Sequence, residues 1–155
     1  MKLSLVAVLA LVPAALAQEK GSITAPTPGQ HIAPGQNFTF KYFGRADYGV
    51  SSYDYSVWLV NSTVFDKKLS FEDVFTNGWF FGRYDYANYP AVPYSTHPAP
   101  KQLSMPNFTK PQGGFGAGQT ASKVNFTLLV IEEYADGGGS VGRKLGTAGV
   151  PIVYN

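Results

Sequence analysis

The stretch Val124-Asn-Phe-Thr-Leu-Leu-Val-Ile131 decides the fold class. Apolar side chains fill every second position at its start, with Asn125 and Thr127 between them. Alternation with a period of two residues is typical of a β-strand with one buried face. From residue 128 to residue 131 both sides become apolar, so 123–134 is the most strongly predicted strand of the chain.

The same alternation recurs in two earlier segments. In 37–43, Phe38, Phe40 and Tyr42 share one face, and the residues between them are polar. In 53–60, the second half is apolar on both faces, which indicates a central strand or a covered outer face. We also expect strands at 22–25, 78–83, 102–105 and 150–154, with the glycine-rich 136–140 as a hairpin connection.

The middle of the chain is harder to interpret. Six prolines between residues 66 and 119 interrupt regular structure, and 67–75 could hold one helical turn or a strand. No window has a sustained helical period. Short aromatic strands separated by Gly and Pro turns predict an all-β fold, a single antiparallel β-sandwich with long Pro/Gly-rich loops.

The N-terminal residues are typical of a secretory signal peptide. Lys2 precedes an apolar run, and Ala15-Leu16-Ala17 has the small-x-small pattern of a cleavage site. The alternative is a membrane anchor, but Pro13 breaks the run, which is shorter than the roughly 20 residues that cross a bilayer. We therefore expect residues 1–17 to be removed and 18–155 to form one secreted, extracellular domain with no membrane anchor.

Charge and cysteine content exclude several classes. Without Lys2, 11 basic side chains stand against 10 acidic ones, so the net charge is +1 and nucleic acid is not an expected partner. The chain has no cysteine, so the core and the backbone ladders must hold the fold. Sequons for N-glycosylation begin at four positions: Asn37, Asn61, Asn107 and Asn125.

The stretch SITAPTPGQHIAPGQNFTFKY, residues 22–42, resembles the start of the immunoglobulin-like domain of fungal cell-wall proteins of the Kre9/Knh1 type. Pro26, Gly29 and Gly35 match the turns of that pattern, and Tyr42 stands where it usually has tryptophan. The resemblance implies an immunoglobulin-like β-sandwich in a fungal secreted protein that binds at the cell wall, and it carries no catalytic residues.

Catalytic and metal chemistry find little support. His31 and His97 are the only histidines, and their spacing is not that of metal ligands. The acidic candidates for glycoside hydrolysis include Glu132 and Glu133, which neighbour each other on a strand and so point to opposite faces. No nucleophile elbow or phosphate loop is present. We expect no cofactor, no metal and no enzyme.

The segment 79–94 is the main candidate site because it is crowded with aromatic residues. It leaves three interpretations open: sandwich core, a platform that stacks on sugars, or a protein interface. We therefore predict a non-catalytic module that binds polysaccharide, with an interaction or effector protein that binds an extracellular protein as the alternative. The candidate ligand-contacting residues are Trp79, Phe81, Tyr84, Tyr86, Tyr89 and Tyr94.

Overall fold

A computed structural model describes residues 20–47, 49–61, 78–87, 92–111, 120–138 and 141–155. The predicted signal peptide and the segment 67–75 lie outside them. The described residues form strands and no helix, which confirms the all-β prediction. The strands are β1 (Ser22–Ala25), β2 (Gln30–Ile32), β3 (Asn37–Thr39), β4 (Lys41–Phe43), β5 (Ala46–Asp47), β6 (Val50–Asn61), β7 (Gly78–Asp85), β8 (Gln102–Ser104), β9 (Val124–Asp136) and β10 (Lys144–Tyr154).

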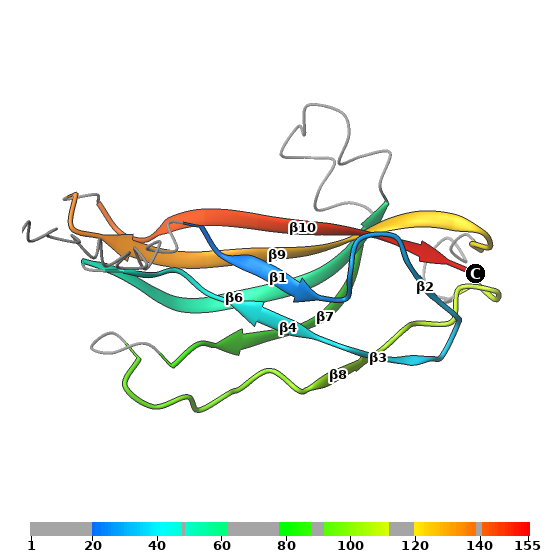
Figure 1. The fold of residues 1–155 in the computed structure, drawn as a ribbon, viewed down its shortest axis with the longest axis horizontal. Coiled ribbons are helices and arrows are strands. Elements are labelled where there is room, and N and C mark those ends of the chain that lie inside the picture. The colour runs from blue at the N-terminus through cyan, green and yellow to red at the C-terminus, as the bar shows by residue number, and fades with distance from the viewer. Residues whose placement is uncertain (1–19, 48, 62–77, 88–91, 112–119, 139–140) are drawn as a thin grey trace, which may run out of the picture.

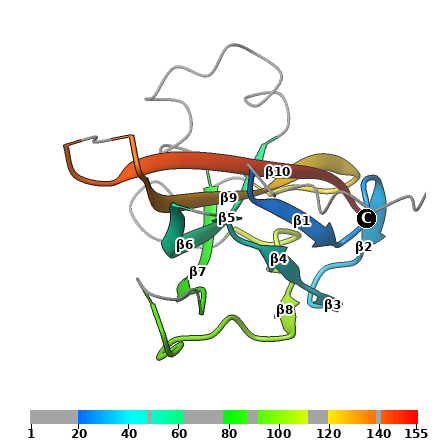
Figure 2. The ribbon, with the colours of Figure 1, turned by 60° about the vertical axis from the view of Figure 1, so that its left-hand side comes forward.

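The strands form two facing layers (Figure 1). The larger sheet has the order β2-β10-β9-β6, with β7 and β5 along the other edge of β6. The smaller layer consists of the pairs β1-β4 and β3-β8. Rotation of the view shows this layer lying across one side of the larger sheet (Figure 2). Among the described residues, no helix is long and apolar enough to span a membrane.

The core fills the space between the layers. Phe38, Phe40 and Tyr42 are buried, while Asn37, Thr39 and Lys41 are exposed, so the alternation gave the correct faces. The larger sheet supplies the opposite wall with the alternate residues Tyr55, Val57 and Leu59 of β6 and Leu128 and Val130 of β9. The intervening residues of these two long strands therefore face outward.

Two details differ from the predicted strands. The strand expected over 37–43 is divided at Phe40, because β3 pairs with β8 and β4 pairs with β1. The closing strand is longer than 150–154, because β10 pairs with β9 along its whole length from Lys144↔Tyr134 to Tyr154↔Val124. The expected strand at 102–105 is present as β8 and that at 78–83 as β7.

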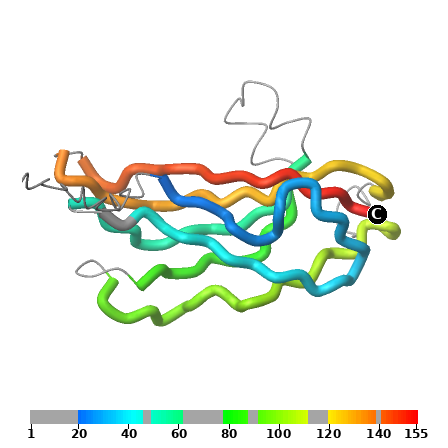
Figure 3. Tube along the Cα trace, in the orientation of Figure 1, coloured from blue at the N-terminus to red at the C-terminus, as the bar shows by residue number. Residues whose placement is uncertain are grey.

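The prediction of a wholly antiparallel sandwich is wrong at one edge. β2 runs parallel to β10, with Gln30 opposite Ile152. After β1, the turn at Pro28-Gly29 carries the chain from the smaller layer to the edge of the larger one (Figure 3). Gly29 has φ 74° in this turn, and its N–H donates to Pro151 O at 2.8 Å. Glycine adopts that backbone conformation without steric cost.

A buried ion pair joins the layers at the end opposite the C-terminus. Glu132 is 1% exposed on β9, and its Oε1 accepts from Arg45 N at 2.7 Å. Arg45 Nε lies 3.2 Å from Glu132 Oε2, and the guanidinium stacks 4.1 Å from the ring centre of Tyr134. Burial, followed by the neighbouring Glu132 charge, raises the pKa of Tyr42. Gly146 leaves room for this arrangement, since a Cβ there would lie 2.5 Å from Arg45 Nη2.

Candidate functional site

An aromatic pair lies on the outer face of the larger sheet. Trp58 of β6 is the cross-strand partner of Phe80 of β7, and their ring centres are 4.6 Å apart with the planes tilted by 41°. Phe80 is 49% exposed and Trp58 is half-buried. Trp58 Nε1 donates to Ser56 Oγ at 3.0 Å, which holds the indole along the strand. The pair thus presents apolar ring surface to solvent in a fixed orientation.

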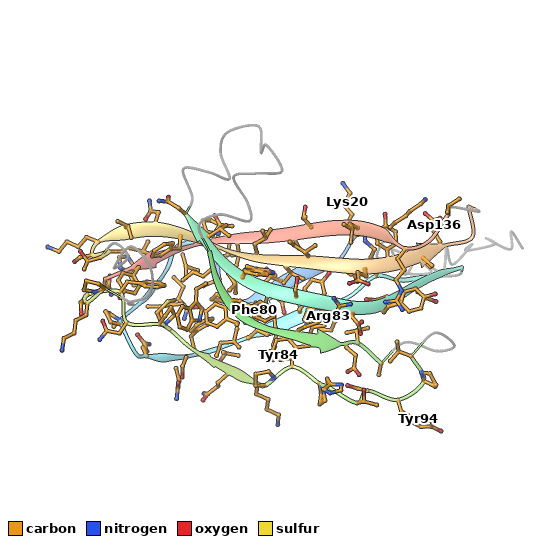
Figure 4. All side chains as sticks on the ribbon, turned by 180° about the vertical axis from the view of Figure 1, so that it is seen from behind. Lys20, Phe80, Arg83, Tyr84, Tyr94 and Asp136 are labelled. Atoms are coloured by element: carbon orange, nitrogen blue, oxygen red, sulfur yellow. The ribbon has the colours of Figure 1, made fainter. Side chains whose placement is uncertain are left out.

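A β-bulge brings charged residues onto the same face. The register of β6 with β7 shifts between Val57↔Gly82 and Trp58↔Phe80. Without the extra residue, strict alternation would point Arg83 and Phe80 to opposite faces. With it, both lie on the outer side, which Figure 4 views directly. Gly82 allows the bulge, because it has φ 156° and a Cβ there would lie 2.5 Å from Tyr84 Oη.

Arg83 belongs to a network of four charged side chains. Its Nη2 lies 2.9 Å from Asp54 Oδ2 and 2.5 Å from Glu133 Oε1. Arg143 Nη1 lies 2.9 Å from Glu133 Oε2 and 3.6 Å from Asp54 Oδ2. The hydrogen bond to Asp54 is the main cause that raises the pKa of Arg83. The guanidinium of Arg143 also lies 4.2 Å from the ring centre of Tyr53.

The rings and charges together form a continuous strip on the outer face. We call it the outer-face strip, and it consists of Trp58, Phe80, Ser56, Arg83, Asp54, Glu133 and Arg143. At about 3.3 Å per residue, β6 separates Trp58 from Asp54 by roughly 13 Å. The strip therefore offers apolar ring surface at one end and preplaced donors and acceptors at the other.

Three of the predicted contact residues pack toward the core instead. Phe81, Tyr84 and Tyr86 are partly buried and lie against the core cluster. Phe81 meets Phe38 edge-on at 6.0 Å, and Tyr84 Oη donates to Phe81 O at 3.2 Å. Burial raises the pKa of Tyr84. The core interpretation thus applies to this part of the segment.

Of the remaining predicted residues, Trp79 lies near the start of β7 and Tyr94 lies beyond its end. Trp79 is 37% exposed and meets Phe108 edge-on at 5.9 Å, away from its neighbour Phe80. Tyr94 is 83% exposed in the loop that follows, and Tyr89 lies outside the described residues. The structure does not bring the rings of Trp79 and Tyr94 together into one platform.

The sequence interpretation missed the partner that makes the pair. Alternation in the expected strand 53–60 places Trp58 on one face with Asp54, Ser56 and Val60, and this pattern is the available signal. It could not show that Phe80 lies opposite, because the register of β6 with β7 contains the bulge. Cross-strand pairing creates the site.

All four sequon asparagines are exposed and lie toward one end of the sandwich. Asn61 ends β6 opposite Phe126, and Asn125 lies opposite Val153 near the C-terminus. Asn37 begins β3 and accepts a hydrogen bond from Ser104 Oγ. Asn107 Oδ1 accepts from Thr109 N at 3.0 Å and from Thr109 Oγ1 at 2.6 Å. The outer-face charges lie toward the other end.

The histidines have ordinary polar partners. His31 Nδ1 lies 2.8 Å from Asn155 Oδ1, and His97 Nδ1 lies 3.0 Å from Thr96 Oγ1. Within the described ranges, no three His, Cys, Asp or Glu side chains converge as a metal site.

Comparison with known proteins returned no relative. No family model matches the chain, and neither a curated protein nor a solved structure matches it.

Proposed function

We propose that the chain is a secreted, non-catalytic immunoglobulin-like module that binds a glycan on the outer-face strip. The observation that carries this proposal is the exposed Trp58–Phe80 pair beside the fixed charges of Arg83 and Asp54. Aromatic rings provide apolar surface for the faces of sugar rings. Carboxylates and guanidinium groups provide acceptors and donors for sugar hydroxyls.

The strand connectivity supports the immunoglobulin-like part. In the constant type of that fold, the first, second, fourth and fifth strands form one sheet and the third, sixth and seventh form the other, and the variable type adds strands to the second of these sheets. Here β1, β3-β4 and β8 make the smaller layer, while β6, β9 and β10 are adjacent in the larger one. The pairing of β7 with β6 corresponds to such an added strand. The resemblance of residues 22–42 to the Kre9/Knh1 type supports the same architecture and a place at a fungal cell wall.

The charge network favours a ligand rich in hydroxyl groups. Both arginines form ion pairs with both Asp54 and Glu133, which restricts their side chains before a ligand arrives. Preorganised polar groups reduce the entropy lost on binding. A neutral sugar can accept from the guanidinium groups and donate to the carboxylates without breaking the network.

Retention on insoluble polysaccharide tests the proposal. The intact chain is expected to be retained on β-glucan or chitin, and Phe80→Ala to weaken retention at least tenfold because it removes the exposed ring. Tyr94→Ala is the matched control, since it removes an exposed ring away from the strip. Failure to be retained on both polymers, or an equal loss with Tyr94→Ala, would contradict the proposal. Thermal unfolding checks that both variants are folded.

A further inference from the structure

The smaller layer has an open strand edge. β4 is hydrogen-bonded to β1, and its other edge faces residues 98–101. At the start of this edge, Phe40 N–H donates to Lys101 O at 3.0 Å. Among the described residues, no backbone hydrogen bond joins β4 to residues 98–100 beyond it. The backbone ladder between the two segments therefore stops at Phe40.

Asp85 of β7 holds the segment before Pro100 against the larger sheet by hydrogen bonds. Its carboxylate accepts from Ser95 Oγ, from Thr96 N at 2.5 Å and Oγ1 at 3.0 Å, and from His97 N at 2.9 Å. Pro98 forms a bridge with Asp85 itself. Burial raises the pKa of this carboxyl, but these hydrogen bonds outweigh burial and hold the pKa at about 2. The segment is thus held on β7, away from β4.

A groove lies between the two segments. It has a volume of about 350 Å³ and is lined by β4, by Pro98 to Lys101 and by the side chains of Tyr55 and Tyr86. A second hollow that shares Phe40, Lys41, Pro100 and Lys101 continues it past Thr39 and Gln102. Phe43, at the end of β4, is 47% exposed beside it. The groove follows the open edge and has an aromatic floor.

The charges around the groove are unbalanced. Lys41 and Lys101 are exposed on its two sides, and neither forms an ion pair within the part of the chain that the structure describes. The acidic side chain that lines the groove is Asp85, whose oxygens already accept four hydrogen bonds. The site therefore carries a local positive charge.

We propose that this edge binds an extended acidic peptide by strand addition to β4. Main-chain hydrogen bonds to an exposed edge give affinity, and pockets for alternate side chains give specificity. Residues of the peptide next to Lys41 and Lys101 are acidic, and those between them are apolar and point to Tyr55 and Tyr86. The site is separate from the outer-face strip, so its occupant does not depend on the glycan.

Titration of the ¹⁵N-labelled chain with acetyl-Glu-Val-Glu-Val-Glu-amide tests this site by NMR. The amide resonances of Lys41, Tyr42 and Phe43 are expected to shift. Hydrogen exchange is expected to slow at least tenfold at Tyr42, whose N–H points to the same side of the strand as that of Phe40, whereas the N–H groups of Lys41 and Phe43 face β1. The same peptide with N-methylated valines is expected to lose at least tenfold in affinity, since it cannot complete the ladder.

Charge variants distinguish binding at the β4 edge from attraction of the acidic peptide to any lysine on the surface. Lys41→Glu with Lys101→Glu is expected to lower the affinity at least tenfold, whereas Lys123→Glu, the same change immediately before β9, leaves it unchanged. No shifts at 41–43 at millimolar peptide, equal affinity for the peptide with lysine in place of glutamate, or equal binding of the N-methylated peptide would each overturn the proposal. Retention on polysaccharide by the double variant shows that the outer-face strip is intact.

Discussion

Glu132→Gln tests the buried ion pair that joins the two layers. The substitution keeps the shape and one acceptor for Arg45 N, but removes the charge that faces the guanidinium at 3.2 Å. Loss of one partner of a buried pair costs about 3–5 kcal/mol. Since the Arg45 side chain is 14% exposed and stacks on Tyr134, part of its charge stays stabilised. We expect a loss at the lower end, about 3 kcal/mol.

Urea denaturation followed by far-UV circular dichroism measures this loss. A decrease of about 3 kcal/mol corresponds to a fall in Tm of roughly 10 °C for a domain of this size. Arg45→Met alone should cost a similar amount, and the double variant Arg45→Met with Glu132→Gln should cost less than the two single changes together. A Glu132→Gln loss below about 1 kcal/mol, or additive losses in the double variant, would refute the reasoning.

Three further predictions concern the hydrogen bonds to the Asp85 carboxylate, the aromatic segment and the sequons. Because hydrogen bonds hold the pKa of Asp85 at about 2, its contribution to stability is complete above the unfolded pKa near 4 and is lost as the pH falls toward 2. Urea titrations at a series of pH values should show that Asp85→Asn flattens this decline. An unchanged slope would contradict the stabilising role of these hydrogen bonds. Phe81→Ala should lower the unfolding free energy by about 2 kcal/mol, but Phe80→Ala by less than about 1 kcal/mol, because only Phe81 packs on the core. Equal losses in thermal denaturation would contradict the assignment of Phe81 to the core and of Phe80 to the surface. Expression through a eukaryotic secretory pathway should remove residues 1–17 and add N-glycans to at least one of Asn37, Asn61, Asn107 and Asn125. The intact mass, measured before and after glycosidase digestion, reports both changes. A retained N-terminus, or a mass that digestion leaves unchanged, would contradict these assignments.

Alternation in the sequence predicted strand faces but not strand partners. The period of two residues in 37–43 placed Phe38, Phe40 and Tyr42 in the core because side chains of a strand point alternately to opposite faces. The change of partner at Phe40 depends on contacts with β8 and β1, which are distant in sequence. The parallel pairing of β2 likewise depends on the end of β10, more than a hundred residues away.

For the candidate site too, the sequence predicted the residue types but not which strands pair. The sequence indicated that 79–94 is rich in aromatic residues, and this richness also serves the core through Phe81 and Tyr84. Which rings face solvent depends on the bulge at Gly82 and on the register that sets Phe80 beside Trp58. A single sequence contains no signal for that register, because the bulge adds one residue to β7 alone.

Fluorescence of a single tryptophan tests the glycan proposal most directly. The chain has two tryptophans, so Trp79→Phe leaves Trp58 as the only indole. Titration with soluble β-glucan and chitin oligosaccharides is predicted to shift and saturate the Trp58 emission with at least one of them, because a sugar that stacks on the pair removes water from the indole. The reciprocal variant Trp58→Phe, which reports from Trp79 near Phe108, should show no such shift. An unchanged Trp58 emission with both ligands would contradict the outer-face strip as the glycan site.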